Sequence, residues 1–440
     1  MTGRVKMDWV LFWVILALVA AGLIMVYSAS ALLYLLKDPG PPRLPFFFRQ
    51  PWAALIGAVV IVFLYWRWRR ATMAGSLACA GVAAAAALQV LVYFLNNDAM
   101  PHYALALRQM GAALIGFLVM IAITQRDYRL LHSPQWAFAS LGIVIFLLIV
   151  VLFTDPGRGR WLNIGVSIQP SEFAKPALIV FLAWFVTLRS LKINNPHTVW
   201  PAALVLCFVG GLVIFADFGT ALVLVATAAA VFFLAGLNRR YTITAAVIGG
   251  LLLAAAIFQK PYRVKRILDR IDRDYKYLIY VDPHKKLLQY ADSGSKVKDT
   301  NYHATQSRVA VGSGGLEGRG LMKSRQKLLF LPEAHTDFIY AIIAEETGLW
   351  GATLVLAAFV VILWRGYRLF WTASDDFGRY LAIGVTTCLL FQALLNMSVV
   401  LDLGPTKGIP LPLVSFGGSS MVSTIMSLGL LLSVSQRSAA

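Results

Sequence analysis

The chain has 440 residues, of which 59% are apolar and only 14% are charged. Soluble domains carry about 25% charged residues, so this composition indicates a membrane protein. Uncharged runs such as residues 9–36 and 136–153 are long enough to cross the bilayer as helices, which excludes a transmembrane β-barrel. The net charge of +18 does not indicate a nucleic-acid partner, because the basic residues lie mostly in the connections between apolar runs, where they suit anionic lipid head groups.

The apolar runs predict an all-α polytopic integral membrane protein with about twelve transmembrane helices in a single domain, residues 1–440. The predicted spans lie near residues 9–36, 51–66, 73–95, 105–124, 136–153, 173–188, 199–215, 219–237, 242–258, 337–364, 380–400 and 413–434. An even number of spans places both termini on one side of the membrane. The excess of Lys and Arg in the short connections on that side predicts that both termini are cytoplasmic.

Two stretches near the front of the chain resemble each other. Residues 49–57 and 108–116 share an Arg-Gln start and an Ala-Ala-Leu-Ile-Gly end, and each opens a predicted span. We interpret residues 49–125 as a duplicated helical hairpin, although matches among Ala, Leu, Ile and Gly also arise by chance in membrane helices.

The longest connection, residues 259–336, is predicted to face outward. Its charged stretch at 262–290 contains several tyrosines, which suits a helix lying on the membrane surface. A solvated charged helix is the alternative. A Gly-rich segment follows at 312–320.

The first outward connection that is rich in polar residues leads into the span near 173–188. Ser171 is placed to cap that helix. Glu172 and Lys175 lie one turn apart and are expected to pair, since charges at the ends of membrane helices usually do. Arg160 has no such partner nearby in the sequence.

A second group of polar residues precedes the span near 337–364. Glu333, His335 and Asp337 could converge on one small volume. Burial at the end of a span raises the pKa of a carboxyl group, and this is how a general base is tuned. The alternative is that Thr336 or Asp337 merely caps the helix.

Other polar residues have a structural alternative of equal weight. Glu345 and Glu346 lie deeper in the same apolar run, where a structural ion pair is at least as good an explanation as chemistry. Asp217 can cap the helix that starts at Gly219. Lys407 lies in a Pro- and Gly-rich connection and could offer a positive charge to a phosphate, or simply extend to the membrane interface.

No nucleotide-binding, metalloprotease or serine-hydrolase motif is present in the sequence. No metal site is predicted from residue spacing. Glu333 and Asp337 leave room for a divalent cation, Mg²⁺ or Mn²⁺, beside a pyrophosphate, but nothing in their spacing requires one.

Taken together, these connections resemble the SEDS family of cell-wall polymerases, the FtsW/RodA/SpoVE proteins, from about residue 159 onward. The resemblance is carried by four motifs in order: Gln169-Pro-Ser-Glu-Phe-Ala-Lys175, Gln306-Ser307 with the glycines that follow, Leu331-Pro-Glu-Ala-His-Thr-Asp-Phe338 with Glu345-Glu346, and Pro410-Leu-Pro-Leu-Val-Ser-Phe-Gly-Gly-Ser-Ser420. The stretches around Pro332 and Lys407 look closer to the FtsW branch than to the RodA branch.

The resemblance implies a peptidoglycan glycosyltransferase of the bacterial inner membrane that polymerises lipid II into glycan strands at its outward face. Undecaprenyl pyrophosphate would be the leaving group, and transfer would invert the anomeric centre. By the family motif, Asp337 is the expected catalytic base. A class B penicillin-binding protein and other proteins of the division or elongation complex are the implied partners.

The remaining site residues are assigned by the same resemblance. Lys407 and Arg160 are expected to neutralise the pyrophosphate, while Glu333 and His335 shape the site. The resemblance adds Gln306, Ser307 and Ser419 as substrate-binding residues. Supporting roles are expected for Glu172, Lys175, Asp217, Glu345 and Glu346.

The sequence departs from the family in two places. Members of the family usually have ten spans, and the two surplus spans predicted here coincide with the repeated hairpin. The stretch 266–301 is longer and more charged than the corresponding connection of the family. Two other functions fit the pattern less well: a lipid II flippase, whose polar groups would lie nearer the bilayer midplane, and a non-catalytic scaffold of a cell-wall synthesis complex.

Overall fold

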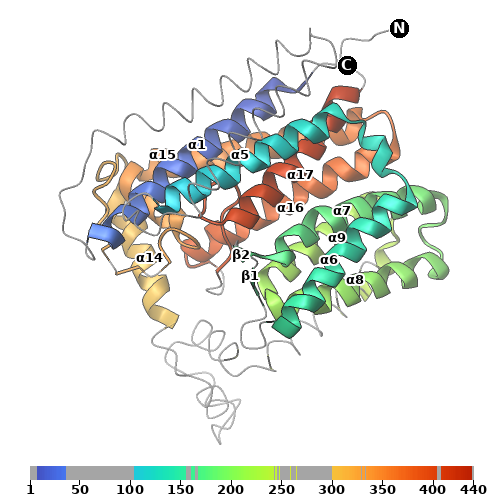
Figure 1. The fold of residues 1–440 in the computed structure, drawn as a ribbon, viewed down its shortest axis with the longest axis horizontal. Coiled ribbons are helices and arrows are strands. Elements are labelled where there is room, and N and C mark those ends of the chain that lie inside the picture. The colour runs from blue at the N-terminus through green and yellow to red at the C-terminus, as the bar shows by residue number, and fades with distance from the viewer. Residues whose placement is uncertain are drawn as a thin grey trace, which may run out of the picture.

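The computed structural model describes residues 7–35, 104–154, 160–163, 167–241, 300–328, 330–331, 333–403 and 408–438, with a few positions between 243 and 264. The described part of the chain is a bundle of long helices (Figure 1). A two-residue antiparallel hairpin, β1 (Leu162–Asn163) with β2 (Ser167–Ile168), accompanies it. The prediction of an all-α membrane fold is therefore confirmed apart from this small hairpin.

Eight described helices are long and apolar enough to cross a membrane. They are α1 (Trp9–Leu35), α5 (Ala104–Gln125), α6 (Pro134–Thr154), α7 (Pro170–Arg189), α8 (Pro196–Ala216), α15 (Ile339–Thr372), α16 (Asp376–Val400) and α17 (Gly418–Arg437). A shorter apolar helix, α9 (Phe218–Leu234), corresponds to another predicted span, and α14 (Thr300–Gly314) lies in the long connection.

Three predicted spans, near 51–66, 73–95 and 242–258, lie wholly or almost wholly outside the described residues. The same is true of the first half of the predicted 49–125 hairpin and of the stretch 266–301. The total of about twelve spans and the duplication therefore stay predictions.

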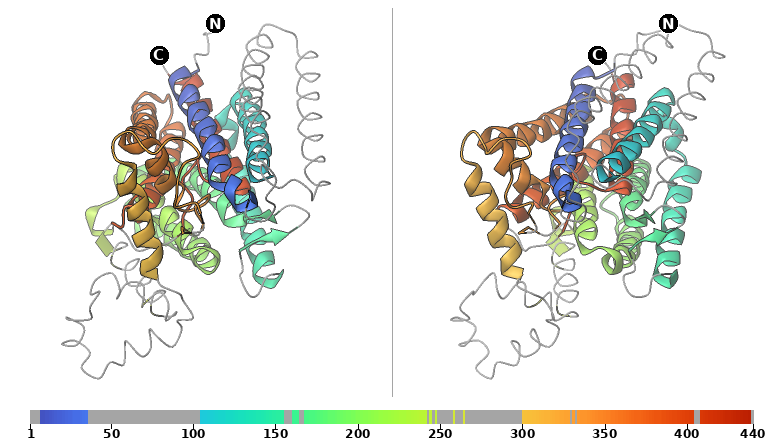
Figure 2. Two further views of the ribbon diagram at one scale, coloured as in Figure 1. Left: turned by 90° about the vertical axis from the view of Figure 1, so that its left-hand side faces the viewer. Right: turned by 60° about the vertical axis from the view of Figure 1, so that its left-hand side comes forward.

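The helices α7, α16 and α17 form the centre of the bundle, and α5 packs along α17 (Figure 2). Most side chains of α7 and α17 are buried, whereas α6 and α8 carry exposed apolar side chains on their outer faces, such as Phe146 and Trp200. Exposed apolar faces of this kind are what a lipid environment requires. Polar side chains that reach the centre must consequently find partners within the protein.

The helix α15 is interrupted at Gly348, whose φ of 69° lies in the left-handed region that glycine tolerates best. The chain after α14 folds back against this interruption. The amide N–H groups of Arg319 and Gly320 donate to the carbonyls of Glu345 and Glu346, each at 2.9 Å. The returning loop thus supplies hydrogen bonds that the broken helix cannot make for itself.

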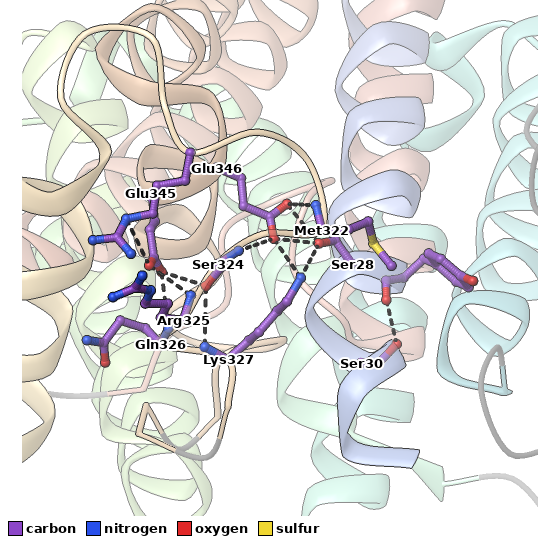
Figure 3. A network of polar contacts seen from close by, with 11 residues as sticks. Ser28, Ser30, Met322, Ser324, Arg325, Gln326, Lys327, Glu345 and Glu346 are labelled. Carbon is purple, nitrogen blue, oxygen red and sulfur yellow. Dashed lines mark hydrogen bonds and ion pairs between the residues drawn. The ribbon is translucent and has the colours of Figure 1, made fainter. Parts of the chain in front are cut away.

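The carboxylates of Glu345 and Glu346 are held by the same loop (Figure 3). Lys327 Nζ lies 2.9 Å from Glu346 Oε1, and Ser28 Oγ of α1 donates to the same carboxylate at 2.7 Å. Ser324 Oγ donates to Glu345 at 2.5 Å. Both glutamates are almost fully buried and have ion-pair and hydrogen-bond partners, as the structural alternative for them expects.

Charged residues gather at the two ends of the bundle. One end, near both described chain ends, holds the ion pairs Asp8–Arg365 at 2.8 Å and Arg129–Asp375 at 2.8 Å. The opposite end holds the start of α15, the start of α7 and the β-hairpin. The polar residues singled out for chemistry in the sequence collect at this second end.

Candidate active site

Asp337 lies two residues before α15, at the second end of the bundle. The residue that precedes the first helical turn is Phe338, and it makes no side-chain capping bond. The alternative that Thr336 or Asp337 merely caps this helix is therefore wrong. No donor among the described residues forms a hydrogen bond to the Asp337 carboxylate.

The backbone around Asp337 is held by three successive hydrogen bonds. The carbonyl of His335 accepts from Phe416 N at 3.0 Å. The carbonyl of Thr336 accepts from Ser415 Oγ at 2.6 Å, and that of Asp337 accepts from Asn396 Nδ2 at 2.8 Å. The segment 335–337 is thus attached to α16 and to the chain before α17.

The segment 408–417 is held in turn by amide side chains of the membrane helices. Asn396 and Gln392 of α16 donate to the carbonyls of Ile409 at 2.6 Å and Pro410 at 2.9 Å. Gln109 of α5 donates to the Ser415 carbonyl at 2.8 Å and accepts from Gly417 N at 3.0 Å.

Sequence analysis did not single out these three amide side chains. Each is buried within an otherwise apolar helix, at 2% exposure or less. A polar side chain in an apolar helix is unfavourable unless it has partners within the protein, and this feature of the sequence could have identified all three residues. Amides recur because they can bind backbone carbonyls without introducing a charge.

Gly408 packs directly on the Asp337 carboxylate. A β-carbon at this position would overlap Asp337 Oδ2. Any larger residue at this position would therefore require the Asp337 carboxylate to move.

Burial raises the pKa of the Asp337 carboxyl to about 7. The positive charge of Arg160 opposes this shift, while the negative charges of Glu333 and Asp217 add to it. Burial also lowers the pKa of His335, partly offset by Glu333. Asp337 therefore changes protonation near neutral pH, as a general base should.

Arg160 finds its partner 57 residues away in sequence, where its guanidinium lies 3.1 Å from Asp217 Oδ2. Asp217 also caps α9, accepting from Gly219 N at 2.9 Å, so the predicted cap is confirmed. The Arg160 side chain remains 40% exposed. A guanidinium has five N–H donors, so a phosphate can bind here without breaking the ion pair.

The pairing predicted for Glu172 and Lys175 is confirmed, with Lys175 Nζ 2.6 Å from Glu172 Oε2. Lys175 also donates to Gln392 at 2.8 Å, which links this pair to the 408–417 segment. The predicted cap at Ser171 is wrong, because α7 begins at Pro170. A proline at the first helical position has no N–H to satisfy, so the helix can begin before the serine.

The other predicted site residues occupy varied positions. Glu333 is exposed, and its carboxylate accepts from Thr336 Oγ1 at 3.0 Å. The ring of His335 lies 5.8 Å from that of Phe416. The charge of Glu333 raises the pKa of Asp337, while His335 shares the backbone segment that the bond from Phe416 N holds.

The substrate-binding residues assigned by resemblance lie farther into the protein or outside its described part. Ser307 is fully buried and donates to the Val400 carbonyl at 2.7 Å, while Ser419 accepts from Gln169 N at 3.0 Å. Gln306 is partly buried on α14. Lys407 lies outside the described residues, next to Gly408 in sequence.

Among the described residues, no group of three His, Cys, Asp or Glu side chains is arranged to hold a metal ion. Glu333 and Asp337 alone do not make a complete cation site. The divalent cation considered from the sequence stays an untested expectation.

Comparison with known proteins finds relatives over most of the chain. Stage V sporulation protein E of Bacillus subtilis is 37% identical over 341 residues, covering 76% of this chain and 87% of its own length. A probable peptidoglycan glycosyltransferase FtsW of Geobacter sp. (strain M18) is 36% identical over 338 residues, covering 75% and 86%.

Two solved structures have the same fold. The rod shape determining protein RodA of Thermus thermophilus matches with a TM-score of 0.59 and 22% identity, covering 99% of this chain and 98% of that one. A chain from a structure described as the structural coordination of polymerization and crosslinking by a peptidoglycan synthase complex matches with a TM-score of 0.59 and 27% identity, covering 80% of this chain and 95% of that one. The family of cell cycle proteins named for FtsW, RodA and SpoVE matches residues 71–440. The chain belongs to the FtsW/RodA/SpoVE family of cell cycle proteins.

Proposed function

We propose that this protein is a peptidoglycan glycosyltransferase that polymerises lipid II, with Asp337 as its general base. The observation that carries the proposal is the Asp337 carboxyl, whose pKa of about 7 and lack of hydrogen-bond donors among the described residues suit a base. Relatives that share 36% identity over 75% of the chain are named as probable peptidoglycan glycosyltransferases, which supports the same reaction.

In the proposed reaction, a sugar hydroxyl of one substrate attacks the anomeric carbon of another. Asp337 accepts the hydroxyl proton as the new glycosidic bond forms and the bond to the pyrophosphate oxygen breaks. The electron pair of the broken bond leaves with undecaprenyl pyrophosphate. A single displacement of this kind inverts the anomeric centre, and no covalent enzyme intermediate is formed.

Negative charge develops on the departing pyrophosphate, and a nearby cation lowers the energy of that state. Arg160 is suited to this role because it is partly exposed and close enough to lower the pKa of Asp337. Lys407 is proposed for the same role from its position in the sequence motif. Gln306, Ser307 and Ser419 are retained as proposed contributors, with Ser307 and Ser419 acting through the backbone that they hold.

The protein is a multi-pass membrane protein, and we propose that it resides in the bacterial inner membrane. The end that carries Asp337 would face outward, with both termini in the cytoplasm. A class B penicillin-binding protein is the proposed partner, supported by the likeness to a chain from a peptidoglycan synthase complex. The growing glycan strand and other division or elongation proteins would complete the assembly.

The test is lipid II polymerisation by the purified protein, with and without its co-purified partner, on a gel that resolves glycan chains. The wild type should form polymer, and Asp337→Asn should reduce the rate by about 10³-fold while still folding and binding the partner. The substitution keeps the shape of the side chain and removes its basicity. Wild-type activity in this variant would exclude Asp337 as the base.

Absence of polymer from the wild type would exclude the glycosyltransferase proposal under these conditions. Lipid II movement across vesicle membranes, measured with the same preparation, would then identify a flippase. Co-purification with the partner, but without polymerisation or lipid II movement, would indicate a scaffold.

A further inference from the structure

Asn396 bridges the two chain segments that meet at Asp337. Its Nδ2 donates to the carbonyls of Asp337 at 2.8 Å and Ile409 at 2.6 Å. The residue is 1% exposed, near the outward end of α16. A primary amide nitrogen has two hydrogens, so both are used in this bridge.

The orientation of the amide follows from its neighbours. A reversed side chain would place Oδ1 against two carbonyl oxygens, with no hydrogen between them. The nitrogen must therefore face the two carbonyls. Asn396 acts only as a donor in this bridge, and an aspartate in its place could not make both bonds.

The bridge determines how the base lies relative to Gly408. Asn396 holds the backbone of Asp337 on one side and that of Ile409 on the other, and Gly408 directly precedes Ile409. The absence of a β-carbon at Gly408 is what lets the carboxylate fit against it. Releasing the bridge would let both the carboxylate and the covering glycine move.

We propose that Asn396 is a positioning residue that holds the Asp337 carboxylate under Gly408 in the geometry needed for proton transfer. This inference rests on the proposed function. Asn396 does not contact the carboxylate and is not itself catalytic. It acts through the two backbone carbonyls, so its removal should impair turnover more than substrate binding.

Among the described residues, the charged groups that act on Asp337 are Arg160, Asp217 and Glu333, with His335 two residues away. Asn396 is uncharged, so its replacement by leucine leaves all of these charges in place. Any change in the ionisation of Asp337 would then come from altered burial of the carboxylate.

The test compares Asn396→Leu with Ser433→Ala. Leucine has nearly the same shape as asparagine and no donor. Ser433 provides a matched control, because its hydroxyl also donates to a backbone carbonyl across elements, that of Arg126 at 3.1 Å, but at the opposite end of the bundle. Asn396→Leu loses two hydrogen bonds to backbone carbonyls and Ser433→Ala loses one, and only the first variant is near Asp337.

Asn396→Leu should lower kcat for lipid II polymerisation about 100-fold and change KM by less than about threefold. The acid limb of its pH profile should move toward lower pH, because a released carboxylate is better hydrated. Ser433→Ala should leave kcat and the pH profile as in the wild type. Wild-type kcat in Asn396→Leu, or a lower rate with an unmoved pH limb, would overturn the proposal.

Hydrogen exchange provides a readout that does not need turnover. Peptides covering 335–341 and 408–417 should exchange faster in Asn396→Leu than in the wild type, while peptides from the opposite end remain unchanged. Unchanged protection of both segments from hydrogen exchange would overturn the proposed bridging role of Asn396, whatever the polymerisation rate of the variant. If the wild type makes no polymer but this exchange pattern is found, the glycosyltransferase proposal fails and the bridge itself stands.

If Asn396→Leu does not fold, Asn396→Ser supplies the same measurements. A serine hydroxyl has a single hydrogen, so it cannot donate to both carbonyls at once. The kcat, the acid limb of the pH profile and the hydrogen exchange of Asn396→Ser should change in the same directions as in Asn396→Leu. Wild-type values would overturn the proposal.

Discussion

Two groups of carboxylates at α15 show how surroundings decide the role of an acidic residue. Glu345 and Glu346 are almost fully buried, and hydroxyl, amide and lysine donors satisfy their oxygens. Asp337 is only partly buried, yet no hydrogen-bond donor among the described residues reaches its carboxylate. The paired glutamates stabilise the fold, whereas the aspartate is kept ready to accept a proton.

The difference follows from the cost of burying charge. A buried carboxylate is tolerated when a cation and hydrogen bonds compensate for its lost hydration. Where that compensation is incomplete, the pKa rises, and the group becomes a base near neutral pH. Backbone hydrogen bonds hold the segment that carries Asp337, and no donor among the described residues reaches its carboxylate.

The largest expected effect on stability comes from breaking the buried pair. Glu346→Gln leaves Lys327 buried without its counter-charge, which should destabilise the protein by about 3–5 kcal/mol. Unfolding of the purified protein in detergent measures this loss. The double variant Glu346→Leu/Lys327→Met should recover most of it, and a loss below about 1 kcal/mol in the single variant would mean that the pair contributes no more than a surface ion pair.

A substitution at Gly408 should act on the base without changing its chemistry. Gly408→Ala places a methyl group where the Asp337 carboxylate lies, so polymerisation should fall about 100-fold. Glycan gels measure the rate. Gly211→Ala in α8 is the matched control, since an added β-carbon there meets nothing within 4 Å. Retention of more than half of the activity in Gly408→Ala would show that the carboxylate has room to move.

Asp337→Asn should stabilise the protein at alkaline pH. The folded-state pKa is about 7 and the ordinary value is 3.8, so the folded state binds the proton more tightly than the unfolded state. Wild-type stability should therefore decrease as pH rises from about 4 to about 7, and the variant should escape this loss, gaining up to about 4 kcal/mol at pH 8. Unfolding of both proteins at pH 5 and pH 8 measures the difference in stability between the variant and the wild type, which should be larger at pH 8. A gap that does not grow with pH would contradict the raised pKa.

The smallest expected effects are shifts of the pH profile. Polymerisation should rise with pH and reach half its maximum near pH 7, since Asp337 must lose its proton to act as a base. Arg160→Gln should move this midpoint to higher pH and Glu333→Gln to lower pH, each by up to about one unit. Initial rates between pH 5.5 and 8.5 measure both shifts. Shifts in the same direction would show that charge does not govern the ionisation of Asp337.

Several features could be predicted because their cause is local in the sequence. Long apolar runs predicted the helices, and the three-residue spacing of Glu172 and Lys175 predicted their ion pair. The Asp217 cap was predicted for the same reason. The Ser171 cap failed because Pro170 also starts a helix well, and local preferences alone did not decide between the two positions.

Other features depend on residues that are far apart in the chain. Arg160 pairs with Asp217 across 57 positions, and Ser28 bonds Glu346 across 318. Asn396 meets Asp337 across 59 positions. No spacing rule connects such partners, because helix packing alone brings them together.

The sequence by itself determined that this is a helical membrane protein, which family motifs it carries and that Asp337 is its candidate base. These properties depend on hydropathy and on short motifs, which can be read along the chain. Only the tertiary structure decided that Glu345 and Glu346 are neutralised and that the Asp337 carboxylate meets no hydrogen-bond donor among the described residues. That distinction depends on the burial and donors that each carboxylate meets, and both arise from contacts between distant segments.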